Sequence, residues 1–251
     1  MKKLSLVVSS LLAGICVGLG GLAFLSVENR VTGAALFTVG LFCICTFGFH
    51  LFTGKVCYVF QNDAAYALSL PLIWLGNLAG TGVTALIASL TRNSAALRER
   101  AMALCQVKLD DGLLSLFFLG VLCNILIYIA VEGFRSNPHE LGKYLSLFFG
   151  VMVFILAGTE HCVADMFYFW MAGAWSGRAI LCVLVITLGN AAGGVLLPLL
   201  RGFIAKHGTY QHGSASGKRK TDVRLPQAIA VSPGVCFRLY NALLICLEKR
   251  L

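Results

Sequence analysis

Long apolar runs separated by short polar segments cover most of the chain. A helix needs about 20 mainly apolar residues to cross a bilayer. Six runs approach or exceed this length: residues 4–25, 32–60, 64–90, 113–131, 145–174 and 180–203. The first run exceeds the roughly 7–15 apolar residues of a secretory signal core, so we expect it to be retained. The pattern predicts an all-α membrane protein with six transmembrane helices and both termini on one side.

Polar residues interrupt the second and fifth runs where the middle of the bilayer is expected. Residues 50–55 break the second run, and Thr159, Glu160 and His161 break the fifth. An ionisable group there costs at least about 2.5–3.5 kcal/mol on insertion scales. Broken backbone at that depth is tolerated only where it is buried or lines a cavity. The two interruptions therefore indicate a pathway through the protein.

The chain also repeats a motif of small residues. The third run carries Gly-Asn-Leu-Ala-Gly at residues 76–80, and the sixth carries Gly-Asn-Ala-Ala-Gly at residues 189–193. Three spans followed by three spans form two inverted halves, and interrupted helices at matching positions of such halves indicate a substrate site. Alternatively, the small residues only permit close helix packing; we expect the glycines to do this in either case.

Composition supports a lipid-embedded protein. Hydrophobic residues make up 58% of the chain and charged residues 12%, whereas soluble domains average roughly 45–50% and about 25%. The net charge of +9 does not indicate a nucleic-acid partner, because most basic residues flank apolar runs, as cytoplasmic anchors do. With cytoplasmic termini, the inner side carries Lys2, Lys3, Arg135, Lys143, Arg201, Lys206 and the C-terminal tail, and the outer side carries Arg30, Arg92, Arg98, Arg100, Lys108 and Arg178. We therefore expect both termini in the cytoplasm and the spans in the inner (plasma) membrane.

Catalytic and metal-binding patterns are not found in the sequence. The ten cysteines include no Cys-x-x-Cys pair and no zinc-ligand spacing with histidine, and several lie inside apolar runs. No nucleophile–base pair or phosphate-binding loop occurs at a useful spacing. We expect no enzyme activity and no cofactor.

Five short motifs resemble those of the formate/nitrite transporter family, in the same order and on the matching spans: residues 51–54, 76–80, 123–124, 158–167 and 188–190. The resemblance covers residues 4–205. It implies an aquaporin-like fold, a homopentamer with one pore per protomer, and permeation by formate, nitrite or hydrosulfide. Matching positions imply a substrate pathway that contains His161, Thr53, Lys108, Asn124, Asn190 and Glu160. They imply apolar constrictions at Leu41, Phe52 and Phe154, with Phe37 and Leu51 nearby.

The chemistry of these residues suits a weak-acid anion. An anion loses hydration energy in an apolar constriction, whereas a protonated weak acid crosses as a neutral molecule. Histidine titrates nearest to neutral pH, so His161 suits this proton exchange, and Thr53 can hydrogen-bond the substrate or the imidazole. Lys108 would raise the local anion concentration, and a helix N-terminus would favour an anion.

Each residue also has a simpler interpretation. His161 could only hold the fifth-span break together, and Lys108 could be a solvated loop residue. Asn124 and Asn190 could only tie helices together, which we consider the better interpretation. The apolar residues are packing residues unless the resemblance makes them constrictions.

Four positions depart from the family pattern. His50 stands where an acidic residue is common, and Lys55 stands where a neutral residue or histidine is common. Thr159 stands where an aromatic residue is common, and Asp165 stands where asparagine is common. They leave the identity of the anion open.

The tail and two other transport classes complete the predictions. Residues 206–251 read as a basic cytoplasmic tail with a polar segment and a short amphipathic helix near the end. A proton-coupled secondary transporter of a small carboxylate is an alternative function. A neutral-solute channel is the weaker alternative, because two Asn-Pro-Ala motifs are missing.

Overall fold

The computed structural model describes residues 2–207, which form helices and no strands. The helices are α1 (Lys2–Leu25), α2 (Arg30–Phe47), α3 (Phe52–Val56), the 3-10 helix η1 (Val59–Gln61), α4 (Ala64–Ser89), α5 (Ser94–Asp110), α6 (Leu113–Ser136), α7 (Glu140–Leu156), α8 (Cys162–Ala172) and α9 (Gly177–His207). Apart from residues 206 and 207, the predicted tail lies outside the described residues.

Five helices of the described chain are long and apolar enough to cross a membrane: α1, α2, α4, α6 and α9. Large apolar side chains such as Leu68, Leu86 and Leu188 are more than half exposed. Apolar surface of this extent marks a membrane interaction rather than a water-exposed surface. The prediction of a multi-pass, all-helical membrane protein is therefore confirmed. The predicted fifth span is divided between α7, which ends at Leu156, and α8, which begins at Cys162.

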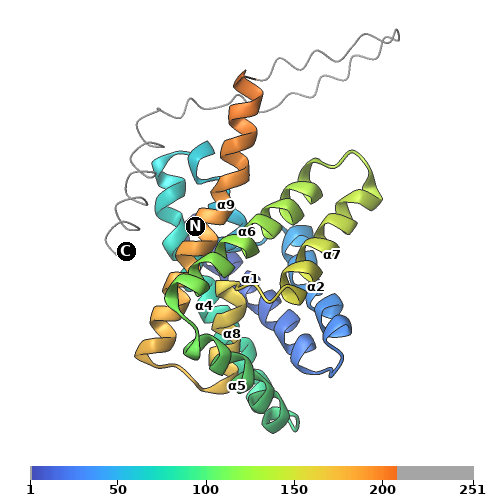
Figure 1. The fold of residues 1–251 in the computed structure, drawn as a ribbon, viewed down its shortest axis with the longest axis vertical. Coiled ribbons are helices and arrows are strands. Elements are labelled where there is room, and N and C mark those ends of the chain that lie inside the picture. Colours follow the sequence, from blue (N-terminus) through green and yellow to red (C-terminus); the bar gives the residue numbers. More distant parts are fainter. Residues whose placement is uncertain (1, 208–251) are drawn as a thin grey trace.

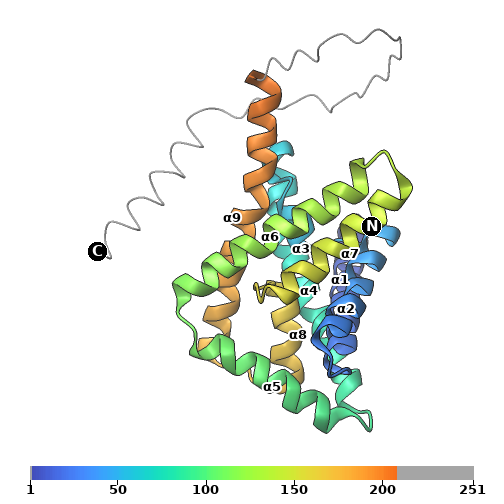
Figure 2. The same cartoon turned by 45° about the vertical axis from the view of Figure 1, so that its right-hand side comes forward.

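The long helices pack against one another in pairs (Figures 1 and 2). Helix α1 packs along α4 and α6 packs along α9, while α2 and α7 pack against each other. Both short helices, α3 and α8, contact α4 and α9. Figure 2 shows α5 at the opposite end of the molecule from the α6–α7 turn.

Glycines allow the close packing of the two long helix pairs. A β-carbon built on Gly80 of α4 would lie 2.0 Å from the Leu11 carbonyl oxygen of α1. A β-carbon on Gly193 of α9 would lie 2.0 Å from the Val121 carbonyl oxygen of α6. These backbones approach each other as closely as small residues permit in membrane helices.

Helix α5 was not predicted, because residues 91–111 read as a polar connection. Its buried residues are Leu97, Ala101, Cys105 and Lys108, and their spacing of three or four places them on one face of the helix. This spacing, which ends at Lys108, is the feature of the sequence from which the helix could have been predicted. The helix packs this face mainly against α8.

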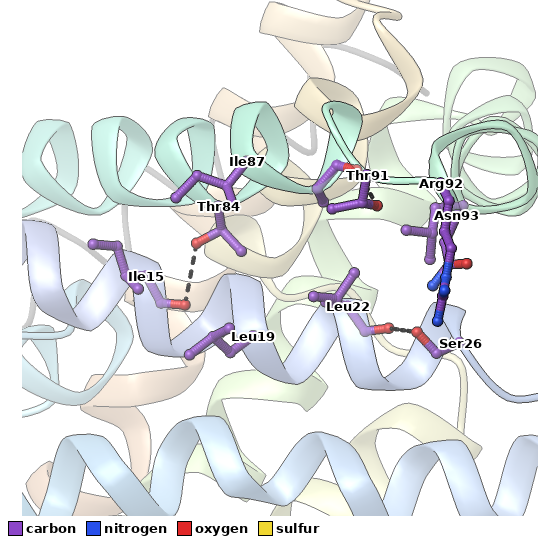
Figure 3. A pocket seen from close by; sticks show the side chains of 11 residues that line it. Ile15, Leu19, Leu22, Ser26, Thr84, Ile87, Thr91, Arg92 and Asn93 are labelled. Carbon is purple, nitrogen blue, oxygen red and sulfur yellow. Dashed lines mark hydrogen bonds between the residues drawn. The ribbon is translucent and has the colours of Figure 1, made fainter.

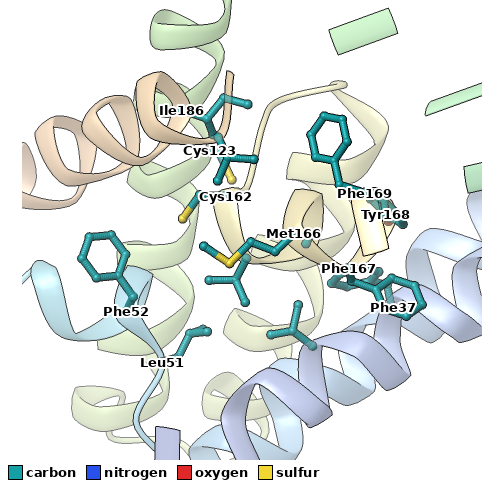
Figure 4. Packing of buried hydrophobic residues seen from close by; sticks show 14 of the residues in the cluster. Phe37, Leu51, Phe52, Cys123, Cys162, Met166, Phe167, Tyr168, Phe169 and Ile186 are labelled. Carbon is teal, nitrogen blue, oxygen red and sulfur yellow. The ribbon is translucent and has the colours of Figure 1, made fainter. Parts of the chain in front are cut away.

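The short helix α8 forms the centre of the core. Met166, Phe167 and Phe169 have no exposed surface, and Figure 4 shows them in the packed cluster that also contains Leu51 and Phe52 from the other half of the chain. A helix that is apolar on all sides is stable only when surrounded by protein or lipid. Here the surrounding helices hold the start of α8 beside the first break.

Candidate functional site

Both interruptions begin with a glycine in the left-handed conformation. Gly48 follows α2 with φ of 71°, and Gly158 follows α7 with φ of 69°. Glycine adopts this conformation without the strain of a β-carbon, and it commonly ends helices. Extended residues follow in each case, with Leu51 before α3 and His161 before α8. The sequence correctly located both breaks.

Asn77 of α4 holds the first break. Its side-chain oxygen accepts a hydrogen bond from the Phe52 backbone N–H at 2.8 Å. Its amide donates to the carbonyl oxygens of Ser10 at 2.8 Å and His50 at 3.0 Å. One side chain therefore satisfies backbone groups that the end of α2 and the start of α3 leave free.

Asn190 of α9 makes the same three contacts at the second break. Its oxygen accepts from the Cys162 backbone N–H at 2.9 Å. Its amide donates to the carbonyl oxygens of Gly120 and Glu160, both at 2.8 Å. Asn77 lay in a predicted motif but had no predicted role; its equivalence to Asn190 in the repeat was the available signal.

Asn124 of α6 links the two breaks. Its amide donates to the Thr53 carbonyl oxygen at 3.1 Å and to the Asn190 carbonyl oxygen at 2.7 Å. Its side-chain oxygen is buried without a hydrogen-bond partner among the described residues. Asn124 and Asn190 thus bond mainly to backbone, the arrangement expected of residues that tie helices together; contact with substrate stays a prediction.

His161 and Thr53 meet where the two breaks approach each other. The His161 Nε2 atom lies 2.9 Å from the Thr53 hydroxyl oxygen, and both side chains are buried. The other ring nitrogen, Nδ1, accepts a hydrogen bond from the Ala164 backbone N–H at 3.1 Å. Because Nδ1 is an acceptor, the neutral ring carries its proton on Nε2 and donates it to Thr53. A second proton on the ring would break the bond that caps α8.

Aromatic rings form a column beside this pair. The Phe154 ring stacks on His161 with centroids 5.6 Å apart. Phe37 of α2 meets Phe154 edge-on at 6.0 Å. Leu41, Leu51 and Phe52, the remaining predicted constriction residues, are also buried. Phe154 therefore covers one face of the His161 ring, and the other predicted constriction residues belong to the buried core.

Lys108 of α5 is buried and bound by two carboxylates. Its ammonium lies 2.9 Å from Glu160 Oε2 and 3.5 Å from Asp165 Oδ1. It also lies 6.0 Å from the centroid of the Tyr168 ring. The interpretation of Lys108 as a solvated loop residue is therefore wrong. One positive charge enclosed by two carboxylates also offers little net attraction to an anion.

Of the other departures from the family pattern, His50 has a structural contact. Its Nδ1 atom lies 2.6 Å from the Ser9 hydroxyl oxygen, and its backbone N–H donates to that oxygen at 3.1 Å. His50 therefore fastens the first break to α1.

A groove of about 290 Å³ lies between α1 and α4, away from these residues (Figure 3). Its walls include Leu19, Leu22 and Ile87, and Arg92 lies at one end. Leu19 and Ile87 are exposed. The groove belongs to the apolar outer surface and contains none of the predicted site residues.

Comparison with known families gives the same assignment as the motifs. The sequence profile described as "Formate/nitrite transporter" matches residues 1–203. The chain belongs to the formate/nitrite transporter family.

Two relatives illustrate the range of this formate/nitrite transporter family. Nitrite transporter NirC of Salmonella typhimurium is 30% identical over 212 residues, which cover 75% of this chain and 78% of the relative. Formate-nitrite transporter 2 of Toxoplasma gondii is 33% identical over 182 residues, or 65% of this chain. The match spans only 39% of the Toxoplasma protein's length.

Solved structures of formate/nitrite transporter proteins share the fold. A pentameric formate channel with formate bound aligns with a TM-score of 0.72 at 23% identity, covering 82% of this chain and 98% of the channel. An ion channel of the same family aligns with a TM-score of 0.71 at 27% identity, covering 80% and 90%. The helices that surround His161 are thus arranged as in a channel family.

Proposed function

We propose that this protein is a membrane channel for small monovalent anions of the formate, nitrite or hydrosulfide class. The observation that carries the proposal is the buried contact between His161 and Thr53, at 2.9 Å, where the two helix breaks meet. The family membership and the names of the relatives support the substrate class.

The apolar column favours a neutral form of the substrate. Phe37 and Phe154 contact each other beside His161, so a charged substrate would lose water there without gaining an ionic partner. A weak acid that takes up a proton avoids most of this cost. His161 can pass its Nε2 proton to the substrate when Nδ1 takes up another proton in its place, which releases the hydrogen bond from the Ala164 backbone N–H.

The fold in this proposal has six spans arranged as two inverted repeats, with α2–α3 and α7–α8 as the interrupted spans. The matching hydrogen bonds of Asn77 and Asn190 support the repeat. We further propose a homopentamer in the inner membrane with both termini in the cytoplasm, based on the fold shared with a pentameric formate channel and on the distribution of basic residues.

Two alternatives differ in their transport behaviour. A proton-coupled secondary transporter of a small carboxylate would saturate and would drive uptake against a gradient. A neutral-solute channel would pass glycerol. The buried His161–Thr53 contact suits proton exchange with an anion better than selection of a neutral alcohol.

The proposal is tested by flux into liposomes that contain the purified protein. Uptake of formate, nitrite, hydrosulfide, lactate and glycerol is measured at two pH values, with protein-free liposomes as the control. We expect rapid, non-concentrative uptake of at least one small anion, faster when the outside is acidic. Glycerol uptake without anion uptake would contradict the proposal, and concentrative uptake would identify a secondary transporter.

A further inference from the structure

The enclosed position of Lys108 leaves the source of anion attraction unexplained. Its ammonium is shared by Glu160 and Asp165, so the three side chains together carry no surplus positive charge when the carboxylates are ionised. A substrate anion approaching the Phe37–Phe154–His161 column therefore needs another cation to meet. The residue placed for this task is Arg30.

Arg30 lies at one end of the helix face that carries the constriction residues. Arg30, Ala34, Phe37 and Leu41 are spaced by four, three and four residues along α2, which places them on one side of the helix. Ala34, Phe37 and Leu41 are buried, whereas Arg30 is exposed at the start of the helix. The face thus runs from a solvent-facing guanidinium to the apolar constriction.

The Arg30 side chain also touches the second break. Its Nη2 atom donates to the Ile155 carbonyl oxygen at 3.1 Å, and Ile155 directly follows Phe154. The same atom would lie 3.7 Å from a β-carbon on Gly158. Arg30 is therefore next to both the aromatic column and the segment that leads to His161, although 125 residues separate it from Ile155.

The positive charge of Arg30 has no carboxylate partner among the described residues. The ion pairs of the described chain join Arg100 to Glu28, Lys108 to Glu160 and Asp165, Arg135 and Arg201 to Glu132, and Lys143 to Glu140. A guanidinium has five N–H donors in a planar fork that fits two oxygens of one anion. One contact, to Ile155, leaves several donors available.

We infer that Arg30 forms an outer capture site for planar anions with two oxygens, such as formate and nitrite, before they enter the constriction. This inference rests on the proposed function and deepens it by naming the residue that gathers the substrate. A cation at a pore mouth raises the local anion concentration, and this effect weakens as salt screens the charge.

Formate uptake into liposomes at low and high ionic strength tests the inference, with formate well below saturation. Arg30→Gln keeps a hydrogen-bond donor for Ile155 but removes the charge. We expect uptake to fall about threefold or more at low salt and the difference from wild type to shrink at high salt. Arg30→Lys should keep most of the salt dependence.

Arg92→Gln is the matched control, because Arg92 is also exposed but lies at the groove between α1 and α4. It should change uptake by less than about twofold, because Arg92 follows α4 and is not on the face of α2 that leads to the constriction. Arg30→Gln uptake equal to wild type at both salt concentrations would overturn the inference. So would an equal reduction at both, because that indicates a structural role at the end of α7.

Two further outcomes distinguish failure of the proposed function from failure of the inference about Arg30. If the wild-type protein carries no anion, the proposed function fails and Arg30 has no substrate to capture. If Arg30→Gln does not fold, Arg30→Lys decides, since loss of the salt dependence in a folded Lys variant contradicts charge-based capture.

Discussion

His161 uses its two ring nitrogens for different contacts. Nδ1 caps α8 by accepting from Ala164, and Nε2 reaches Thr53. The two interpretations of this residue, as a structural group and as a proton carrier, are therefore compatible. The structural contact places the proton of the neutral ring on Nε2, and a proton taken up by the ring at Nδ1 would replace the bond to Ala164.

Replacing His161 with Asn should separate these roles. Asparagine is a good N-cap, so α8 should keep its start, while the titratable ring is lost. We expect formate uptake to lose most of its pH dependence and the thermal unfolding midpoint to change little. His139→Asn is the control, because His139 is exposed before α7 and makes no side-chain cap. A pH profile equal to wild type in His161→Asn would exclude proton exchange at this residue.

The ion-pair partners of Lys108 could not be predicted from the sequence. Its position before the fourth span was evident, but its carboxylate partners Glu160 and Asp165 follow more than 50 residues later. A buried ion pair is costly to break, because removing one member leaves an uncompensated charge.

We therefore expect Lys108→Met to destabilise the protein by about 3–5 kcal/mol. Thermal unfolding in detergent measures this, and adding Glu160→Gln and Asp165→Asn should recover part of the loss. Lys143→Met is the control, because Lys143 pairs with Glu140 at the surface and should cost less than about 1 kcal/mol. Equal effects of the two single variants would contradict the expected cost of leaving buried carboxylates without their cation.

At the scale of elements, the two long helix pairs depend on glycine contacts. In the sequence, the polar interruptions and the repeated Gly-Asn motif indicated which helices form the predicted pathway. The small residues of the motif explain why the backbones of the paired helices approach closely. Helix α5 was not predicted from the sequence, because most of its residues are polar or exposed and the buried face consists of Leu97, Ala101, Cys105 and Lys108.

Gly80→Ala should disrupt the α1–α4 pair. The new β-carbon would lie 2.0 Å from a backbone oxygen, so the helices must separate. We expect a loss of about 1–3 kcal/mol or more, visible as a lower thermal midpoint or as aggregation during size-exclusion chromatography. Gly202→Ala on α9 is the control, because it meets nothing within 4 Å and should stabilise its helix by up to about 1 kcal/mol. Similar behaviour of both variants would contradict a tight α1–α4 contact.

At the scale of the whole molecule, large apolar side chains are exposed along the spanning helices. Lipid covers such surfaces, and neighbouring protomers can cover part of them. The fold is shared with a pentameric formate channel, which is the basis for the proposed homopentamer.

The particle mass in mild detergent checks the oligomer. We expect, after correction for bound detergent, five times the chain mass of 26.9 kDa. Light scattering coupled to chromatography gives this value, and chemical cross-linking should yield a ladder that ends at five chains. A monomer that still conducts anions would show that the pore needs no partner.

The apolar runs alone identify a membrane protein, and the polar residues within them mark the two breaks. Long apolar runs are needed to span lipid, and polar interruptions within them are rare and costly, so both are readable without a structure. Which polar groups meet is evident only from the packing of the helices. Thr53 and His161 are 108 residues apart, and Arg30 and Ile155 are 125 apart. Such contacts depend on how helices pack, because each helix displays many side chains and only packing selects those that touch.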